Sequence, residues 1–136
     1  MLNDDDLNRY ARQVIIPNFD EEGQEKLLGT KCLIIGAGGL GCPVALYASA
    51  AGFGHIEIFD DDTIDLTNLN RQIAHKNNKI GYNKAENLVQ ECSKINPNIT
   101  IKSLMGPGID HPLADHSKPQ IIETIIGFFI SPSSTR

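Results

Sequence analysis

Short apolar runs alternate with helical periodicity between residues 31 and 104. Residues 31–35 form a nearly continuous apolar run, which is typical of a strand buried on both faces, and residues 55–59 predict a second strand. Between them, residues 40–51 are rich in small side chains and predict a helix that ends at Gly52. Apolar positions from Ala85 to Ile95 follow the i, i+3, i+4, i+7 pattern of an amphipathic helix, and residues 99–104 alternate like a third strand. The pattern predicts an α/β, Rossmann-like three-layer fold with a mainly parallel sheet.

The flanking residues divide the chain into three parts. Residues 1–30 predict an N-terminal helical segment, with a short helix and then an extended stretch between Leu2 and Ile16, and a second short helix from Glu21 to Leu28. Residues 31–130 form the main domain, with a polar functional loop containing short helical pieces at 63–81 and a fourth buried strand within 120–130. Residues 131–136 are expected to be a disordered tail.

Composition excludes several classes of protein. The 12 Lys and Arg against 17 Asp and Glu give a net charge of −5, which disfavours a general nucleic-acid binder. The apolar stretches are far shorter than the roughly 20 residues that a bilayer requires. The three cysteines are widely spaced, so we expect buried free thiols and neither a disulfide framework nor a CxxC zinc pair. The polar, acidic N-terminus is no signal peptide, and a cytoplasmic location follows as an expectation.

A glycine-rich turn joins the first predicted strand to the first helix of the main domain. Gly36 allows a tight turn, Gly38 allows close approach of a phosphate, and Gly41 allows helix–strand packing. The following helix N-terminus offers N–H groups to an anion. Asp60 follows Gly41 by 60 − 41 = 19 residues and ends the second strand, where an acid commonly binds ribose hydroxyls. These features predict nucleotide binding and leave both NAD and ATP open.

Cationic residues around this unit favour ATP. They occur in the segments 9–13, 67–72 and 81–84. An enzyme that handles a triphosphate needs several cations, because negative charge builds on the phosphates as pyrophosphate leaves. A dehydrogenase needs none of them.

Five motifs occur in a fixed order between residues 7 and 104: RYARQ, GQEKL, GAGGLGC, DxDxxDLxNLxRQ and GxxKA. In this order they resemble the ThiF/MoeB/HesA family of adenylation domains, which is related to ubiquitin-activating enzymes. The resemblance implies a domain that binds ATP and Mg²⁺. It also implies activation of the C-terminal Gly-Gly carboxylate of a ubiquitin-like or sulfur-carrier protein, through an acyl-adenylate and with release of pyrophosphate.

The resemblance also implies roles for individual residues. Arg12 would be an arginine finger that enters the site of the other subunit, in a homodimer or in a pair with a full-length relative. Such a cation stabilises transition-state charge. The other implied roles are a nucleotide loop that includes Gly39 and Gly41, a ribose contact from Asp60, ribose and phosphate contacts from Asn68 and Arg71, and a phosphate countercharge from Lys84.

The match is incomplete toward the C-terminus, so the sequence resembles a C-terminally shortened member. Ile126 falls where the family has an aspartate linked to magnesium, and Glu123 falls near an earlier acid of that motif. The later catalytic cysteine, the zinc CxxC pairs and the sheet for the protein partner have no counterpart. Cys42 is expected to be packed within its helix.

Two other functions therefore stay open beside ATP-dependent adenylyl transfer. One is a non-catalytic homologue that binds adenine nucleotide or dimerises. The other is an NAD-dependent oxidoreductase, since the glycine turn and Asp60 serve NAD equally well.

Overall fold

The protein has a four-stranded mixed sheet at its centre. The computed structural model describes residues 1–104 and 125–129. The strands are β1 (Lys31–Ile35), β2 (His55–Phe59), β3 (Thr100–Leu104) and β4 (Ile125–Phe129), in the spatial order β3-β2-β1-β4. β1, β2 and β3 are parallel, whereas β4 pairs with β1 in the antiparallel direction. The four predicted strands and the mainly parallel sheet are confirmed.

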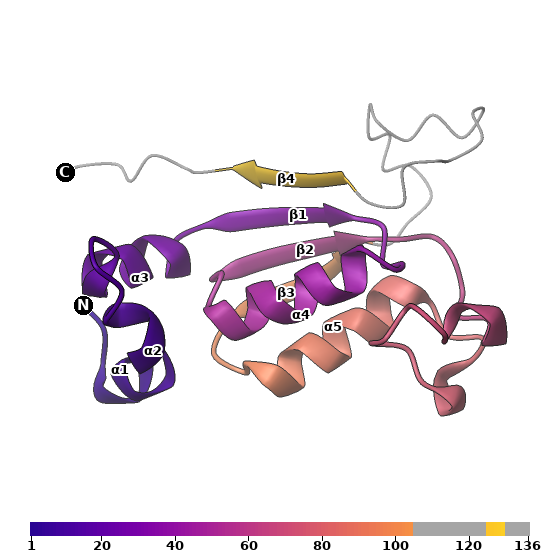
Figure 1. The fold of residues 1–136 in the computed structure, drawn as a ribbon. Coiled ribbons are helices and arrows are strands. Elements are labelled where there is room, and N and C mark those ends of the chain that lie inside the picture. The colour runs from indigo at the N-terminus through magenta and orange to yellow at the C-terminus, as the bar shows by residue number, and fades with distance from the viewer. Residues whose placement is uncertain (105–124, 130–136) are drawn as a thin grey trace.

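Two helices cover one face of the sheet. α4 (Gly41–Ala51) connects β1 to β2, and α5 (Lys84–Ile95) precedes β3. Because β2 and β3 are added on the same side of β1, right-handed crossovers place both helices on the same face (Figure 1). The core lies between this face and the helices. It is formed by small and branched side chains that include Cys32, Ile34, Cys42, Ala45, Ile56, Ile58, Ala85, Leu88 and Cys92.

Three short helices form the N-terminal segment: α1 (Asp4–Arg9), α2 (Ala11–Val14) and α3 (Asp20–Leu28). They gather near the amino-terminal ends of the parallel strands (Figure 1). The expected extended stretch before Pro17 is wrong over residues 11–14, which are helical. Side chains of this segment find partners on the main domain, and these tertiary contacts override the local pattern.

The N-terminal segment is attached to the main domain by buried hydrogen bonds. The Tyr10 hydroxyl oxygen accepts a bond from Asn96 Nδ2 at 2.8 Å, and Tyr10 is 1% exposed. Gln13 Nε2 and Gln24 Nε2 both donate to the Ala51 carbonyl oxygen, at 3.0 and 3.1 Å. The two glutamine bonds bind the Ala51 carbonyl oxygen at the C-terminal end of α4, which has no partner inside the helix. The Tyr10–Asn96 bond joins the segment to the end of α5.

The remaining expectations are mostly confirmed. The polar loop carries two short 3₁₀ helices, η1 (Leu66–Asn68) and η2 (Asn77–Lys79). All three cysteines are free and buried, while the reducing compartment inferred from them stays a prediction. Among the described residues, no helix is long and apolar enough to cross a membrane. Glu123 and the tail 131–136 lie outside the described residues.

Two glycines with the same backbone conformation allow the attachment of the N-terminal segment to be tested. Gly52 has φ +90°, and a Cβ there would lie 2.7 Å from the Tyr10 ring and from Gln24 Nε2. Gly81 has φ +88° and nothing within 4 Å of its Cβ position. We expect Gly81→Ala to cost about 1–2 kcal/mol from backbone strain. Gly52→Ala adds about 1–3 kcal/mol of overpacking to the same strain. Urea unfolding of both variants measures this, and equal losses would show that Tyr10 does not press on Gly52.

Candidate nucleotide-binding site

The glycine loop lies where β1 ends and α4 begins. Gly36 has φ +97°, a left-handed conformation that favours glycine, which confirms the predicted tight turn. Within the described residues, no group accepts a hydrogen bond from the N–H groups of residues 38–41. These donors stand at the N-terminus of an eleven-residue helix, where the helix dipole favours an anion. The loop therefore has the donors that a phosphate requires.

Asp60 fixes the start of this loop. Its Oδ2 accepts a hydrogen bond from the Ala37 N–H at 2.6 Å, and its Oδ1 accepts one from the Asp62 N–H at 2.8 Å. The carboxylate thus lies beside the loop, at the carboxyl end of β2. Each oxygen keeps a second lone pair, so a ribose hydroxyl can still donate to it. Its predicted contact with ribose stays a prediction.

Lys84 is held at the same edge of the sheet. Its side chain is 7% exposed, and its Nζ forms an ion pair with Asp62 Oδ2 at 3.0 Å. Asn83, which caps α5, donates from Nδ2 to the Asp60 and Asp62 carbonyl oxygens at 2.9 and 3.3 Å. The first turn of α5 is thereby fixed against the end of β2. The structure brings Lys84, Asp60 and the glycine loop together, as the family resemblance implied.

Asn68 and Arg71, in and just after η1, bind groups of their own segment. Asn68 Oδ1 accepts the Asp65 N–H at 2.9 Å in a capping box, so this oxygen stabilises the turn. Arg71 is exposed and donates to the Thr67 carbonyl oxygen at 3.2 Å and to Asn70 Oδ1 at 3.1 Å. No described contact joins Asn68 or Arg71 to Asp60 or Lys84, and their nucleotide roles stay predictions.

Gln72 connects this segment to the glycine loop. It is 5% exposed, and its Nε2 lies 3.5 Å from the Cβ position of Gly38. Its Oε1 is buried and has no hydrogen-bond partner in the part of the chain that the structure describes. An amide donor therefore lies over Gly38, beside the free N–H groups.

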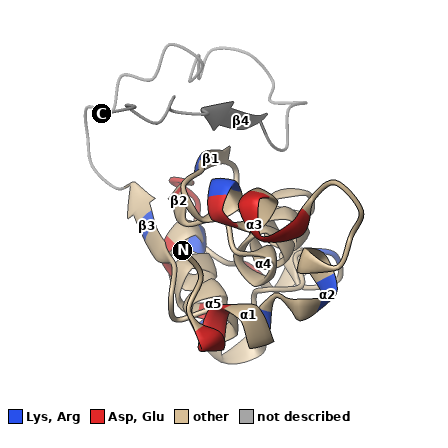
Figure 2. Ribbon diagram, turned by 90° about the vertical axis from the view of Figure 1, so that its left-hand side faces the viewer, with Lys and Arg blue, Asp and Glu red and all other residues tan. Residues whose placement is uncertain are grey.

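Arg12 lies on the other side of the molecule. α2, whose only charged residue is Arg12, is at the amino-terminal ends of the strands, away from the turn between β1 and α4 (Figure 1). Figure 2 looks at the molecule from this end and shows the basic position on α2 in blue. Arg9 donates to the Ile95 carbonyl oxygen at 3.2 Å, and Tyr10 and Gln13 are used in the attachment described above. Arg12 is exposed, and no described residue binds its guanidinium. Arg12 is thus not placed in the site of its own chain.

A buried polar cluster lies beneath the glycine loop. His75 Nε2 is 2.8 Å from the Ala37 carbonyl oxygen, and His75 Nδ1 is 2.9 Å from Asn87 Nδ2. Cys42 Sγ donates to the same carbonyl oxygen at 3.4 Å and lies 3.7 Å from His75 Nε2. Burial raises the pKa of the Cys42 thiol to about 11, so it stays a neutral thiol. This confirms that Cys42 is packed, and a thiolate nucleophile is not formed here.

Sequence reasoning missed five residues of this region: Asp62, Gln72, His75, Asn83 and Asn87. The sequence could have identified Gln72, because it is the last residue of the motif that contains Asn68 and Arg71. His75 and Asn87 are twelve positions apart and carry no spacing signal, since a histidine on a loop and an asparagine on a helix become neighbours only through the fold.

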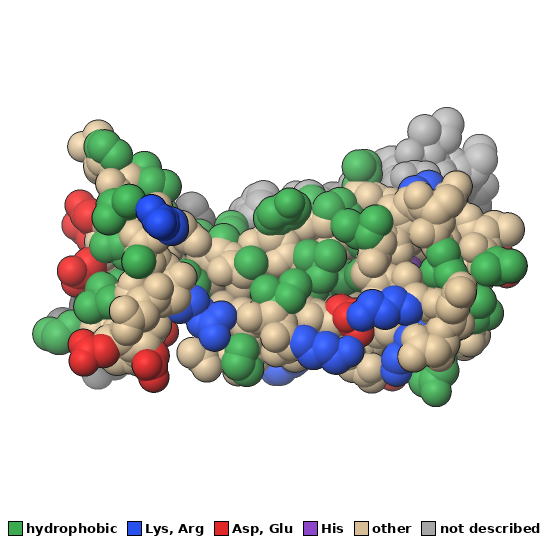
Figure 3. Space-filling model, turned by 60° about the horizontal axis from the view of Figure 1, so that its bottom comes forward, with side chains coloured by type: hydrophobic (Ala, Val, Ile, Leu, Met, Phe, Trp, Pro, Cys, Tyr) green, Lys and Arg blue, Asp and Glu red, His purple; other side chains and the backbone are tan. Residues whose placement is uncertain are grey.

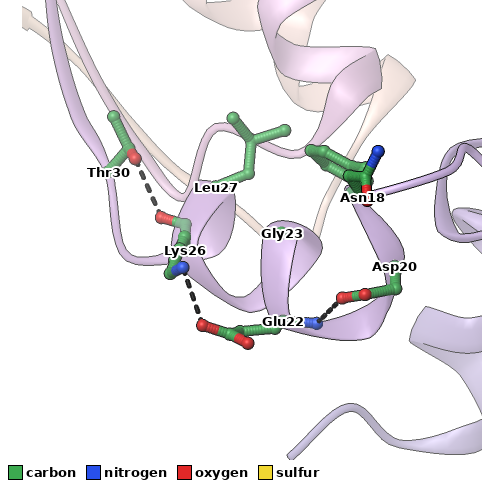
Figure 4. Close-up of a pocket in the computed structure, with 8 residues that line it drawn as sticks. Asn18, Asp20, Glu22, Gly23, Lys26, Leu27 and Thr30 are labelled. Atoms are coloured by element: carbon green, nitrogen blue, oxygen red, sulfur yellow. Dashed lines mark hydrogen bonds and ion pairs between the residues drawn. The ribbon is translucent and has the colours of Figure 1, made fainter.

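A hollow elsewhere on the surface has fewer free polar groups to bind a ligand. It has a volume of about 350 Å³ and is lined by the segment around α3, including Asp20, Glu22 and Lys26 (Figure 4). Its charged groups already satisfy one another, since Lys26 pairs with Glu22 at 2.7 Å and Asp20 accepts the Glu22 N–H at 3.0 Å. The glycine loop, whose donors are free, is the better candidate.

The residues at the glycine loop fit an adenine nucleotide. Free N–H groups and Lys84 suit phosphate, Asp60 suits ribose, and the unpartnered Gln72 amide adds a polar group over Gly38. For Mg²⁺, the described residues contain no group of three or more His, Cys, Asp or Glu that could hold a metal ion. We therefore assign no metal ligands.

Comparison with known proteins agrees with this geometry. The adenylyltransferase and sulfurtransferase UBA4 of Scheffersomyces stipitis is 45% identical over 100 residues, which are 73% of this chain and 23% of that protein. The adenylyltransferase and sulfurtransferase MOCS3 of Drosophila sechellia is 44% identical over 100 residues, 74% of this chain and 22% of that one. The chain thus spans less than a quarter of the length of these curated relatives.

A solved structure and a family model also match this chain. The crystal structure of E. coli MccB with ATP superposes with a TM-score of 0.67 at 31% identity, and the match covers 86% of this chain and 36% of MccB. The model of the ThiF family matches residues 10–124. With its glycine loop, its parallel strands and its motif order all in agreement, this chain belongs to the ThiF family.

Proposed function

We propose that this chain is the nucleotide-binding part of an ATP-dependent adenylyltransferase that activates the C-terminal carboxylate of a ubiquitin-like or sulfur-carrier protein. The observation that carries the proposal is the set of free N–H groups at residues 38–41, with Asp60 and Lys84 beside them. The relatives named adenylyltransferases and the relative solved with ATP support ATP over NAD.

The proposed reaction is an attack on ATP, and the loop N–H groups and Lys84 stabilise the charge that it produces. A carboxylate oxygen of the protein substrate attacks the α-phosphorus of ATP, and the bond from that phosphorus to the bridging oxygen breaks as pyrophosphate leaves. The loop N–H groups and Lys84 stabilise charge on the phosphates during this transfer. Lys84 is buried, so its charge is weakly screened and acts strongly on a nearby phosphate.

Arg12 fits this reaction only in an assembly. Its neighbours Arg9, Tyr10 and Gln13 are used within the chain, and Arg12 alone extends outward. Hydrophobic side chains are exposed on the face seen in Figure 3. Leu40, the residue before α4, and Tyr47, on α4, are 58% and 78% exposed. α4 has no charged residue. An apolar surface of this kind favours a second subunit, which would receive Arg12 in its site.

A thermal melt tests nucleotide choice. A ligand that binds only the folded state raises the melting temperature. We expect ATP with Mg²⁺ to raise the Tm of the chain, and NAD to leave it unchanged. A rise with NAD alone would favour the oxidoreductase. A rise with ATP but no ATP–pyrophosphate exchange with any carrier protein would favour the non-catalytic homologue.

Lys76 is the control for Lys84, because it forms an ion pair of similar length with a residue of the same helix. Lys76 pairs with Glu91, which is on α5, at 2.9 Å, close to the 3.0 Å of the Lys84–Asp62 pair, but Lys76 is 59% exposed. We expect Lys84→Gln to weaken ATP binding about 10- to 100-fold, because it removes a charged hydrogen bond to phosphate. Lys76→Gln is expected to leave the Kd unchanged. Calorimetric titration at a temperature where both variants are folded measures this, and equal Kd values for the two would refute the role of Lys84.

Mixing two variants tests Arg12. Arg12→Ala and Lys84→Gln are each expected to lose ATP–pyrophosphate exchange. If Arg12 acts in the partner's site, the mixed dimer has one site with both residues, and random pairing restores about a quarter of wild-type exchange. Doubling the concentration of either variant alone is the control. No recovery on mixing, with mixed dimers present, would contradict a role of Arg12 in the partner's site.

A further inference from the structure

The peptide groups on both sides of Ala37 are held from opposite directions. Its N–H donates to Asp60 Oδ2 at 2.6 Å, and its carbonyl oxygen lies 2.8 Å from His75 Nε2. Ala37 is fully buried and directly precedes Gly38, where the free N–H groups begin. Asp60 follows β2, whereas His75 belongs to the loop before α5. Two separate parts of the chain thus fix one residue of the loop.

The direction of each hydrogen bond follows from the groups involved. The Ala74 carbonyl oxygen can only accept, so the Asn87 atom 3.2 Å away is its amide nitrogen. That nitrogen can only donate, so His75 Nδ1 at 2.9 Å must be unprotonated. The ring proton is then on Nε2, where it is donated to the Ala37 carbonyl oxygen. Asn87 thereby selects the tautomer that binds the loop.

We propose that His75, oriented by Asn87, is a positioning residue that holds the glycine loop in the shape that receives the nucleotide phosphates. This rests on the proposed nucleotide function of the loop. His75 is 4% exposed and does not itself reach solvent, so it acts through Ala37. The glycines that follow Ala37 lose much conformational entropy when a ligand fixes them. Because Ala37 is already held in the free protein, less of this entropy is lost on binding.

Two substitutions at His75 separate positioning from general packing. His75→Gln keeps an N–H donor near the place of Nε2, whereas His75→Leu keeps bulk and loses the donor. We expect His75→Leu to weaken ATP binding about five- to tenfold, and His75→Gln to recover most of the loss. Both are titrated well below their Tm. Wild-type affinity in folded His75→Leu, or no recovery by His75→Gln, would overturn the proposal.

Two measurements need no nucleotide, so they separate this proposal from the proposed function. In ¹⁵N spectra of the wild-type chain, His75 should show a protonated Nε2 and an unprotonated Nδ1, and Asn87→Ala should allow the other tautomer. In His75→Leu, the Ala37 amide should exchange its hydrogen about tenfold faster. The bond to the Ala37 carbonyl oxygen is lost, so the residue is less restrained and its N–H separates from Asp60 more often. A protonated Nδ1, or unchanged exchange at Ala37, overturns the positioning role even if ATP binds. Absence of ATP binding by the wild-type chain with both signatures intact would refute only the nucleotide function.

The stability of the chain should also depend on His75 as the pH changes. Burial is the main cause that lowers the pKa of His75 below 6.5, with Lys84 lowering it further and the Ala37 carbonyl, Asp60 and Glu91 raising it. The unfolded chain then binds the proton more readily, so stability is lost as pH falls below 6.5. We expect Tm to fall between pH 7.5 and 5.5, and to fall less in His75→Gln. The pKa values of Glu91 and Asp65 lie below their ordinary values, so these two carboxyl groups do not account for the change. Equal slopes in both proteins would contradict a neutral, buried His75.

Discussion

The hydrogen bond from the Ala37 N–H to the Asp60 carboxylate joins the two strand ends around which the site is arranged. It fixes the turn after β1 to the end of β2. Asn83 then binds the carbonyl oxygens of Asp60 and Asp62, which places the first turn of α5 and, with it, Lys84. Together with the bond between His75 and the Ala37 carbonyl oxygen, the Asp60 contact fixes the loop donors relative to the lysine.

This arrangement gives Asp60 two functions that do not conflict. In the sequence, its distance from the glycines suggested a ribose contact. In the structure, the same carboxylate supports the loop through backbone N–H groups, which occupy one lone pair of each oxygen. An acid at this position can therefore stabilise the fold in the free protein and still accept a hydroxyl from a ligand.

The sequence predicted the strands from short apolar runs or alternation, and α5 from its i, i+3, i+4, i+7 period. It predicted the ends of α3 and α4 from Gly29 and Gly52. It did not predict that residues 11–14 are helical, because that helix depends on long-range partners such as Ala51 for Gln13. Nor did it predict the antiparallel direction of β4, since an apolar run does not encode the direction of pairing. For the site, spacing from the glycines pointed to Asp60, and the motif resemblance pointed to Lys84. The buried pair His75–Asn87 carries no sequence signal, because the two residues become neighbours only in the fold.

The most direct test of the account is an NMR titration of the ¹⁵N-labelled chain with ATP and Mg²⁺. The account predicts that the largest shifts occur at the amide groups of residues 38–41, whose N–H groups have no acceptor among the described residues, and that NAD does not produce them. Shifts that leave these amides unchanged, or that centre on the hollow around α3, would contradict it.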